Sequence, residues 1–311
     1  MMISKIPDWM ITTKDFTHRM DFLRDCEQKS YGMLMNSFHD LENDFEDHFN
    51  SMGYKAWSIG PVSLWVNKDA THKADRYNIN SGIDGAQGHE VIDWLNSKEN
   101  NSVLYVGFGS LTKLPATQID EIAHGLEASG HPFIWVVRKK DNVEYGEAFQ
   151  EGFEERMKEI KRDYIIRGWA PQVLILDHPA IGGLVTHCGW NSVLEGVNAG
   201  LPMITWPMFA EQFYNEKLLI DVLRIGVAVG VKEWREWGEE GTAVVSRAQV
   251  EKAVRLLMGE GEEAAELRKR VRKLRDGAKK AVEIGGSSYN SLMALIDELK
   301  SLKINKGVQV V

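Results

Sequence analysis

The segment Trp169–Gln212 holds several kinds of side chain that could bind a ligand together. It carries a tryptophan with a nearby glutamine, a histidine, an amide and hydroxyl pair at an expected helix start, and a final acid and amide pair. An indole can stack on a planar base, and imidazole, amide and hydroxyl groups can donate hydrogen bonds to phosphate oxygens. Carboxylate and amide groups can bind vicinal sugar hydroxyls. The combination predicts a site for a base, a diphosphate, a ribose and a hexose, which packing alone does not require.

The phosphate-binding part is expected where the predicted strand 182–187 meets the next helix. His187 ends the strand, Gly189 allows a close backbone approach, and Asn191 and Ser192 begin the helix. Unpaired N–H groups and the positive end of the helix dipole attract phosphate at such a point. The alternative is that Asn191 or Ser192 only caps the helix.

A second strand end carries Ser110 in the sequence GFGS, where Gly107 and Gly109 free the backbone. The third glycine of the dinucleotide fingerprint is missing, which disfavours a NAD enzyme. The chain has no Gly-Lys dipeptide, which excludes a P-loop. Taken alone, GFGS is also typical of an ordinary turn between a strand and a helix.

Trp169 follows the predicted strand 164–167 and could stack on a base, although a core tryptophan is the alternative. Gln172 could bind base or ribose, or could simply occupy the turn set by Pro171. Glu195 lies one helical turn after Asn191 and so faces the same side.

A carboxylate such as Glu195 could accept hydrogen bonds from ribose hydroxyls. Glu211 and Gln212 begin the next predicted helix and could bind hexose hydroxyls. An acidic first helical turn is the alternative explanation for this last pair.

Short apolar runs alternate with helical patterns through most of the chain, which predicts a parallel α/β sheet. The predicted strands are 102–108, 133–137, 164–167, 182–187, 202–206 and 227–231. Ligands bind beyond the carboxyl ends of such strands, where the candidate residues fall. Gly130 is expected to end one helix, Ser246 with Gln249 to cap another, and a single helix to run from Glu211 to about Leu223.

The beginning of the chain is less regular. The run 31–38 is apolar enough for a buried strand, and Leu41, Phe45 and Phe49 form one apolar stripe on a following helix. Residues 67–89 are polar and rich in Gly, Asn and Asp, which predicts a linker or a long surface loop.

Composition narrows the function classes. The 311 residues carry a net charge of −8, which argues against broad nucleic-acid binding, and the basic stretch 267–280 has the apolar spacing of a surface helix. No apolar run approaches the ~20 residues of a membrane span, and no signal peptide is apparent. Cys26 and Cys188 do not suggest a disulfide scaffold, so a cytoplasmic protein is expected.

The segment Trp169–Gln212 closely resembles the signature box of the plant family 1 UDP-dependent glycosyltransferases of secondary metabolism. The length and nearly all fixed positions match, and the resemblance extends from about Trp57 to Leu302. It implies a GT-B fold, an α/β architecture of two Rossmann-like halves with the site between them. It also implies transfer with inversion, a UDP-sugar as co-substrate, and neither a metal nor another cofactor.

The resemblance also implies a role for each candidate side chain. Trp169 would stack on uracil, the Ala170 backbone and Gln172 would hold base and ribose, and Glu195 would bind ribose hydroxyls. The diphosphate would be held by Ser110, His187, Asn191 and Ser192, with Gly189 leaving space. The sugar would be contacted by Trp190, Glu211 and Gln212. Glu211 stands where many members have Asp, and Gln212 suits glucose in many members.

By this resemblance, the implied acceptor is a small hydrophobic hydroxylated molecule, of triterpenoid or flavonoid type. The family's general base is a histidine near the start of the N-terminal half, and no matching segment exists here. His18 has a charged, helix-like context that does not suit a catalytic base, and His39 and His48 fit a solvated helix face better than a metal site. No catalytic residue is therefore assigned in this chain.

The expected organisation follows from this comparison. Residues 1–57 are a remnant of the N-terminal acceptor domain, 58–90 an interdomain linker or loop, 91–285 the C-terminal UDP-sugar-binding domain, and 286–311 a C-terminal helix and tail packing back on the N-terminal part. The missing half leaves an alternative open, a non-catalytic UDP-sugar-binding module or a donor subunit.

Overall fold

The computed structural model describes residues 16–66, 85–110, 112–137, 153, 156–157, 162–234 and 244–306. The described residues form two compact units, one within Lys73–Arg272 and the other within Thr12–His72 and Lys273–Val311. The boundary between Arg272 and Lys273 falls inside one helix, α14 (Glu262–Ala281). No helix in these ranges is both long and apolar enough to cross a bilayer.

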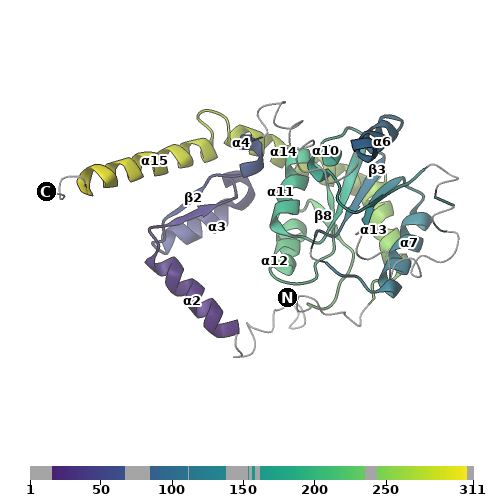
Figure 1. Cartoon of the computed structure of the whole chain (residues 1–311), viewed down its shortest axis with the longest axis horizontal. Coiled ribbons are helices and arrows are strands. Elements are labelled where there is room, and N and C mark those ends of the chain that lie inside the picture. Colours follow the sequence, from purple (N-terminus) through teal and green to yellow (C-terminus); the bar gives the residue numbers. More distant parts are fainter. Residues whose placement is uncertain are drawn as a thin grey trace. The chain divides into compact units, whose positions relative to one another are not determined.

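A parallel sheet forms the centre of the first unit (Figure 1). It has six strands, in the order β5-β4-β3-β6-β7-β8. The strands are β3 (Val103–Gly107), β4 (Phe133–Val137), β5 (Tyr164–Arg167), β6 (Ile181–Thr186), β7 (Met203–Thr205) and β8 (Gly226–Ala228). Every residue of β3, β6 and β7 is buried. Because buried parallel strands have no exposed face, they are continuous apolar runs. The predicted α/β class is confirmed.

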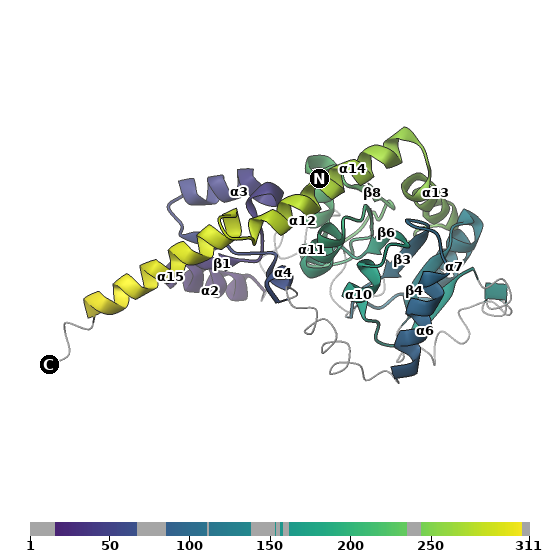
Figure 2. The same cartoon turned by 90° about the horizontal axis from the view of Figure 1, so that it is seen from above.

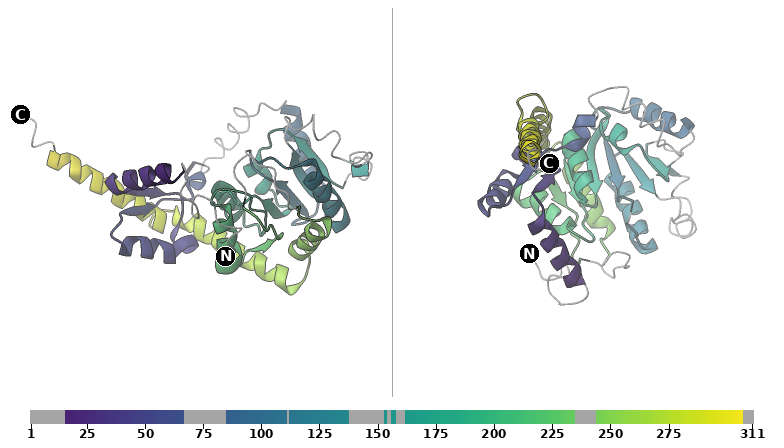
Figure 3. Two further views of the ribbon diagram at one scale, coloured as in Figure 1. Left: turned by 90° about the horizontal axis from the view of Figure 1, so that it is seen from below. Right: turned by 60° about the vertical axis from the view of Figure 1, so that its left-hand side comes forward.

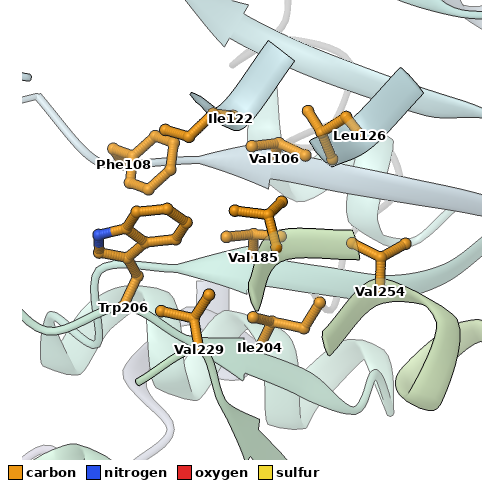
Figure 4. Close-up of a pocket in the computed structure, with 10 residues that line it drawn as sticks. Val106, Phe108, Ile122, Leu126, Val185, Ile204, Trp206, Val229 and Val254 are labelled. Atoms are coloured by element: carbon orange, nitrogen blue, oxygen red, sulfur yellow. The ribbon is translucent and has the colours of Figure 1, made fainter. Parts of the chain in front are cut away.

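One layer of helices packs on the face of the sheet to which Val185 and Ile204 point. These two side chains, with others from α7 (Ala116–Ser129) and α13 (Arg247–Met258), line an apolar cavity of about 10 Å³ (Figure 4). That volume is about the size of one water molecule. The cavity is a small packing gap and is far too small for a nucleotide.

The opposite face is covered by α11 (Trp190–Ala199), as Figures 1 and 3 show. Leu184 and Met203 alternate with the residues that face the other layer and point toward this helix. A Cβ at Gly196 would lie 2.5 Å from Met203 Cε and 3.0 Å from Leu184 Cδ2. Glycine at this position therefore lets α11 approach the sheet closely.

The strand order places a change of direction between β3 and β6. From β3 the chain continues outward to β4 and β5, and from β6 it continues the other way to β7 and β8. Gly107 of β3 pairs with Thr186 of β6, so the two strands end at the same level. In doubly wound sheets, ligands bind in the crevice at this point.

The helix ends follow local sequence rules in two places. Ser246 and Gln249 form the predicted capping box of α13, and Gly130 ends α7 with a left-handed φ of 78°. The expected single helix from Glu211 is interrupted, because α12 (Gln212–Lys217) continues as a π-helical turn, Leu218–Val222. Apolar spacing does not distinguish the two kinds of turn.

The second unit is built on a two-stranded parallel sheet of β1 and β2. Its elements are α2 (Phe16–Lys29), β1 (Met33–Met35), α3 (His39–Ser51), β2 (Ala56–Ser58), α4 (Val62–Val66) and α15 (Ser287–Lys306). Helix α15 packs beside β2, which Figure 1 labels, and Figure 2 shows the same helix from above. Ser288, which is fully buried, donates from Oγ to Gly60 O at 2.6 Å.

Hydrogen bonds also join the two chain segments that form the second unit. Lys55 Nζ and Tyr31 Oη both hydrogen-bond to Glu298 of α15, and Lys55 Nζ donates to Tyr31 Oη at 3.0 Å. The strand predicted over 31–38 is shorter than expected, and Leu34 of β1 has 59% of its surface exposed. This sheet therefore keeps an apolar side chain in contact with solvent.

The predicted linker 58–90 is partly helical. Helix α4 lies at its beginning, and α6 (Gly85–Asn96) begins before its end. Residues 67–84 of this predicted linker lie outside the described residues. The predicted domain boundaries remain a prediction.

Candidate functional site

The loops that follow β3 and β6 meet at the carboxyl edge of the sheet. The imidazole of His187 lies between Gly109 and Gly189. A Cβ at Gly109 would lie 2.5 Å from His187 Cε1, and a Cβ at Gly189 would lie 2.5 Å from His187 Nε2. Gly109 also has a left-handed φ of 72°. Both glycines are therefore required for the ring to occupy this position, with Ser110 exposed beside it.

His187 is a neutral ring in the free protein. Its Nδ1 is buried and has no hydrogen-bond partner among the described residues. Burial lowers the pKa of His187 from 6.5 to about 4, because a charged imidazolium is poorly solvated there. A neutral imidazole can donate one hydrogen bond to a phosphate oxygen and accept another.

Two side chains stabilise the turn after His187 by hydrogen bonds to the backbone of Cys188. Cys188 has a φ of 64°, an unusual value for a residue with a side chain. Thr186 Oγ1 accepts a hydrogen bond from Cys188 N at 3.1 Å, and Asn215 Nδ2 of α12 donates to Cys188 O at 2.8 Å. Burial raises the pKa of the Cys188 thiol, so this residue is structural and not a reactive thiolate.

Helix α11 begins directly after this turn. Gly189 is the N-cap, and Trp190 is the first helical residue. Asn191 and Ser192 are the second and third helical residues, so the alternative that one of them caps the helix is wrong. Backbone N–H groups in the first helical turn have no acceptor within the helix. Together with the exposed Asn191 side chain and the half-buried Ser192 hydroxyl, they offer donors to an anion.

Trp169 lies on the surface of the same edge. It follows β5 through Gly168, whose φ is 108°, and 49% of its surface is exposed. The alternative of a core tryptophan is therefore wrong for this residue. Ala170 is buried next to it, and α10 (Gln172–Leu176) begins two residues later. An exposed indole at a strand end is available for stacking on a base.

A hydrogen-bonded chain connects α10, α11 and β3. Gln172 Nε2 donates to Glu195 Oε2 at 2.6 Å, and Tyr105 Oη donates to Gln172 Oε1 at 3.1 Å. Burial raises the pKa of Glu195, and the hydrogen bond from Gln172 partly opposes this. Gln172 therefore contacts Glu195 directly, and the two residues form one unit.

The acid and amide at the start of α12 differ in environment. Glu211 is exposed, whereas Gln212 is almost fully buried. Gln212 Oε1 accepts from the backbone N–H groups of Met208 and Phe209, at 2.9 and 3.2 Å. Because these bonds occupy the oxygen, any contact from Gln212 to a sugar hydroxyl must be made by its amide nitrogen as a donor.

The remaining histidine candidates lie elsewhere. His18 lies in α2 of the second unit, and its side chain is outside the described residues. His39 Nδ1 lies 3.5 Å from Glu46 Oε2 on an exposed part of α3. In the part of the chain that the structure describes, no group of three or more His, Cys, Asp or Glu side chains could hold a metal ion.

Sequence reasoning misses two residues that contact this site. In the sequence, Tyr105 is only part of an apolar strand, and Asn215 is only part of a helix. The phenol hydroxyl in an otherwise apolar run is a usable signal, because a buried hydroxyl needs a partner. Asn215 has no comparable local signal, since its partner is a backbone carbonyl 27 residues away.

Comparison with known proteins identifies the family to which the chain is similar. The profile of the family "UDP-glucoronosyl and UDP-glucosyl transferase" matches residues 68–236. Soyasapogenol B glucuronide galactosyltransferase of Glycine max is 54% identical over 98% of this chain, which spans 61% of that protein. UDP-glucosyl transferase 73CC6 of Saponaria officinalis is 46% identical over the whole chain, which spans 64% of it.

Solved structures agree with the fold. UGT73P12 of Glycyrrhiza uralensis, complexed with glycyrrhetinic acid 3-O-monoglucuronide, superposes with a TM-score of 0.88 at 52% identity, over 97% of this chain and 60% of that one. UGT71G1 of Medicago truncatula, complexed with UDP-glucose, superposes with a TM-score of 0.79 at 32% identity, over 94% and 59%. The chain thus spans about three fifths of these relatives. It belongs to the plant family 1 UDP-dependent glycosyltransferases, which have the GT-B fold.

Proposed function

We propose that this chain supplies the donor site of a UDP-glycosyltransferase that transfers a hexose, glucose, to a hydroxyl of a small plant metabolite with inversion. The observation that carries the proposal is that His187, the start of α11 and the Gln172–Glu195 pair lie at one edge of the sheet, beside the adjacent ends of β3 and β6. The acceptor class is triterpenoid or flavonoid. Relatives named for soyasapogenol B glucuronide and for a flavonoid support that class.

In this proposal each part of UDP-glucose has its own group of side chains. Uracil stacks on the exposed Trp169, beside the Ala170 backbone, and ribose hydroxyls donate to Glu195. The diphosphate accepts hydrogen bonds from Ser110, from His187 and from the first turn of α11, including Asn191 and Ser192. The sugar contacts Trp190, the exposed Glu211 carboxylate and the amide nitrogen of Gln212.

The leaving UDP carries the charge that develops as the bond to the sugar breaks. Helix N–H groups and neutral donors are fixed before the reaction, so they stabilise this charge without reorganising. We propose that no metal ion takes part. A reducing cytoplasm is the compartment we propose, since Cys26 and Cys188 are both free thiols.

Binding of UDP tests the site directly. Trp169→Ala and His187→Ala should each weaken UDP binding by at least tenfold, or ~1.4 kcal/mol, measured by isothermal titration calorimetry. His124→Ala is a matched control, because His124 lies on α7 and pairs with Asp120. Unchanged affinity in both site variants would contradict the assignment.

Turnover tests the wider activity. The chain should be assayed alone with UDP-glucose, UDP-galactose and a panel of triterpenoid and flavonoid acceptors. Faster transfer from UDP-glucose would support the glucose assignment. UDP binding without turnover would favour the alternative of a donor module or subunit, because no general base is assigned in this chain.

A further inference from the structure

Tyr105 is buried in the middle of the sheet, yet its hydroxyl reaches the candidate ribose site. The residue is 1% exposed and belongs to β3, and its phenol ring lies beside Gly107. A Cβ at Gly107 would lie 2.8 Å from Tyr105 Cε1 and 3.5 Å from Gln172 Oε1. Glycine at this position leaves the space in which the ring and the amide meet.

The direction of each hydrogen bond in the chain is determined by chemistry. An ionised carboxylate only accepts, so the Gln172 amide must present its nitrogen to Glu195, at 2.6 Å. The amide oxygen is then turned to Tyr105, and the phenol must donate to it, at 3.1 Å. Burial and the charge of Glu195 raise the pKa of Tyr105, which keeps the phenol protonated. No member of the chain can be reversed without placing two acceptors together.

From this geometry we propose that Tyr105 is a positioning residue for the ribose-binding carboxylate. Its hydroxyl holds the Gln172 amide in one orientation, and the amide holds one oxygen of Glu195. The second oxygen, Glu195 Oε1, is thereby aimed at the ribose hydroxyls. This inference rests on the proposed function, in which Glu195 binds ribose.

Removing the hydroxyl would disrupt the chain at its buried end. Phe at position 105 fills nearly the same volume, so the strand should keep its packing. Gln172 Oε1 would lose its donor in a partly buried site, which is unfavourable. The amide would then rotate to find another partner, and Glu195 would lose its defined orientation.

The experiment compares UDP with 2′,3′-dideoxy-UDP, which lacks both ribose hydroxyls. Dissociation constants are measured by calorimetry for the wild-type chain, Tyr105→Phe, Glu195→Gln and the double variant. Tyr164→Phe is the matched control, because Tyr164 begins β5 and hydrogen-bonds to a different carboxylate, Glu90.

Wild type and Tyr164→Phe should prefer UDP by roughly tenfold or more, since hydrogen bonds to charged groups are strong. Tyr105→Phe should lower this preference by roughly three- to tenfold, while its affinity for the dideoxy compound stays within twofold of wild type. The double variant should show no further loss beyond Glu195→Gln, because both changes act through one carboxylate.

The outcomes distinguish ribose binding by Glu195 from the positioning role of Tyr105. If wild type shows no preference for UDP, or Glu195→Gln keeps it, Glu195 does not bind ribose, and the proposed role fails together with the inference. If Glu195→Gln loses the preference and Tyr105→Phe keeps it, only the positioning role of Tyr105 is overturned. Equal weakening of both ligands in Tyr105→Phe would show a general structural effect and would also overturn it.

Discussion

Replacement of Gly109 by alanine should separate UDP binding from folding. The new Cβ would lie 2.5 Å from His187 Cε1 and 2.7 Å from its Nε2. An ordinary contact begins near 3.4 Å, so the ring would have to move by roughly 1 Å, enough to break a hydrogen bond of normal length. Because the ring is at the end of a side chain, it can move without unfolding the protein.

Gly130→Ala provides the matched control for this change. Gly130 has a φ of 78°, close to the 72° of Gly109, but no atom lies within 4 Å of the position that a Cβ would take there. Both variants should lose about 1–2 kcal/mol of stability from the left-handed backbone. Only Gly109→Ala should also lose UDP affinity, by at least tenfold or ~1.4 kcal/mol.

The assay pairs urea unfolding with calorimetric titration of UDP on both variants. Similar unfolding midpoints with a large difference in UDP affinity are expected. If Gly109→Ala binds UDP within twofold of Gly130→Ala, the position of the His187 ring does not matter for the diphosphate. That result would refute the role assigned to the two glycine loops.

Three further changes test other parts of the first unit. Gly182→Ala should destabilise the fold by more than about 2 kcal/mol in urea unfolding, because the new Cβ would lie 2.2 Å from the backbone oxygen of Asn101. Gly261→Ala is the control, since its Cβ would have open space and the change should be neutral. Equal unfolding midpoints for the two variants would contradict this. Asn215→Ala should cost about 1–2 kcal/mol of stability and weaken UDP binding, because Cys188 O would lose its hydrogen bond from Asn215. Unchanged UDP affinity by calorimetry would show that Asn215 does not support the loop that binds the diphosphate. Because burial lowers the pKa of His187 from 6.5 to about 4, only the unfolded chain takes up this proton between pH 6.5 and 4. The resulting stability is present above pH 6.5 and is lost as the pH falls, by up to ~3.5 kcal/mol at ~1.4 kcal/mol per pKa unit. His187→Gln should therefore flatten the pH dependence of stability in urea unfolding, and an identical pH dependence would contradict this.

Sequence alone predicted all six strands of the parallel sheet, with bounds that differ from those of the structure by at most three residues. Phe133–Val137 and Tyr164–Arg167 have the bounds expected, because short runs rich in β-branched and aromatic residues are typical of strands. The start of α6 at Gly85 was not predicted, since its residues are polar and rich in glycine. Local composition favours a loop there, so residue type alone does not predict the helix.

The residues of the candidate site stay a prediction, and the contacts between them could not be predicted from the sequence. The capping alternative for Asn191 and Ser192 is reasonable from residue type, but Gly189 occupies the N-cap. The contact of Gln172 with Glu195 joins residues 23 positions apart, and the burial of Gln212 depends on the fold of the preceding loop. Such contacts are set by tertiary structure, so propensity and spacing cannot supply them.

Parallel topology explains why one contiguous segment carries most of this site. Each crossover helix returns the chain to the opposite edge, so the carboxyl ends of β5, β6 and β7 all lie at one edge, and the loops after them deliver Trp169, His187 and Glu211 in turn. The same rule does not reveal that β3 lies next to β6, because strand order is not local. Ser110 and Tyr105 reach the site only through that adjacency. Ser110 could still be proposed from the sequence, because it directly follows a predicted strand, whereas the buried phenol of Tyr105 had to come from the structure.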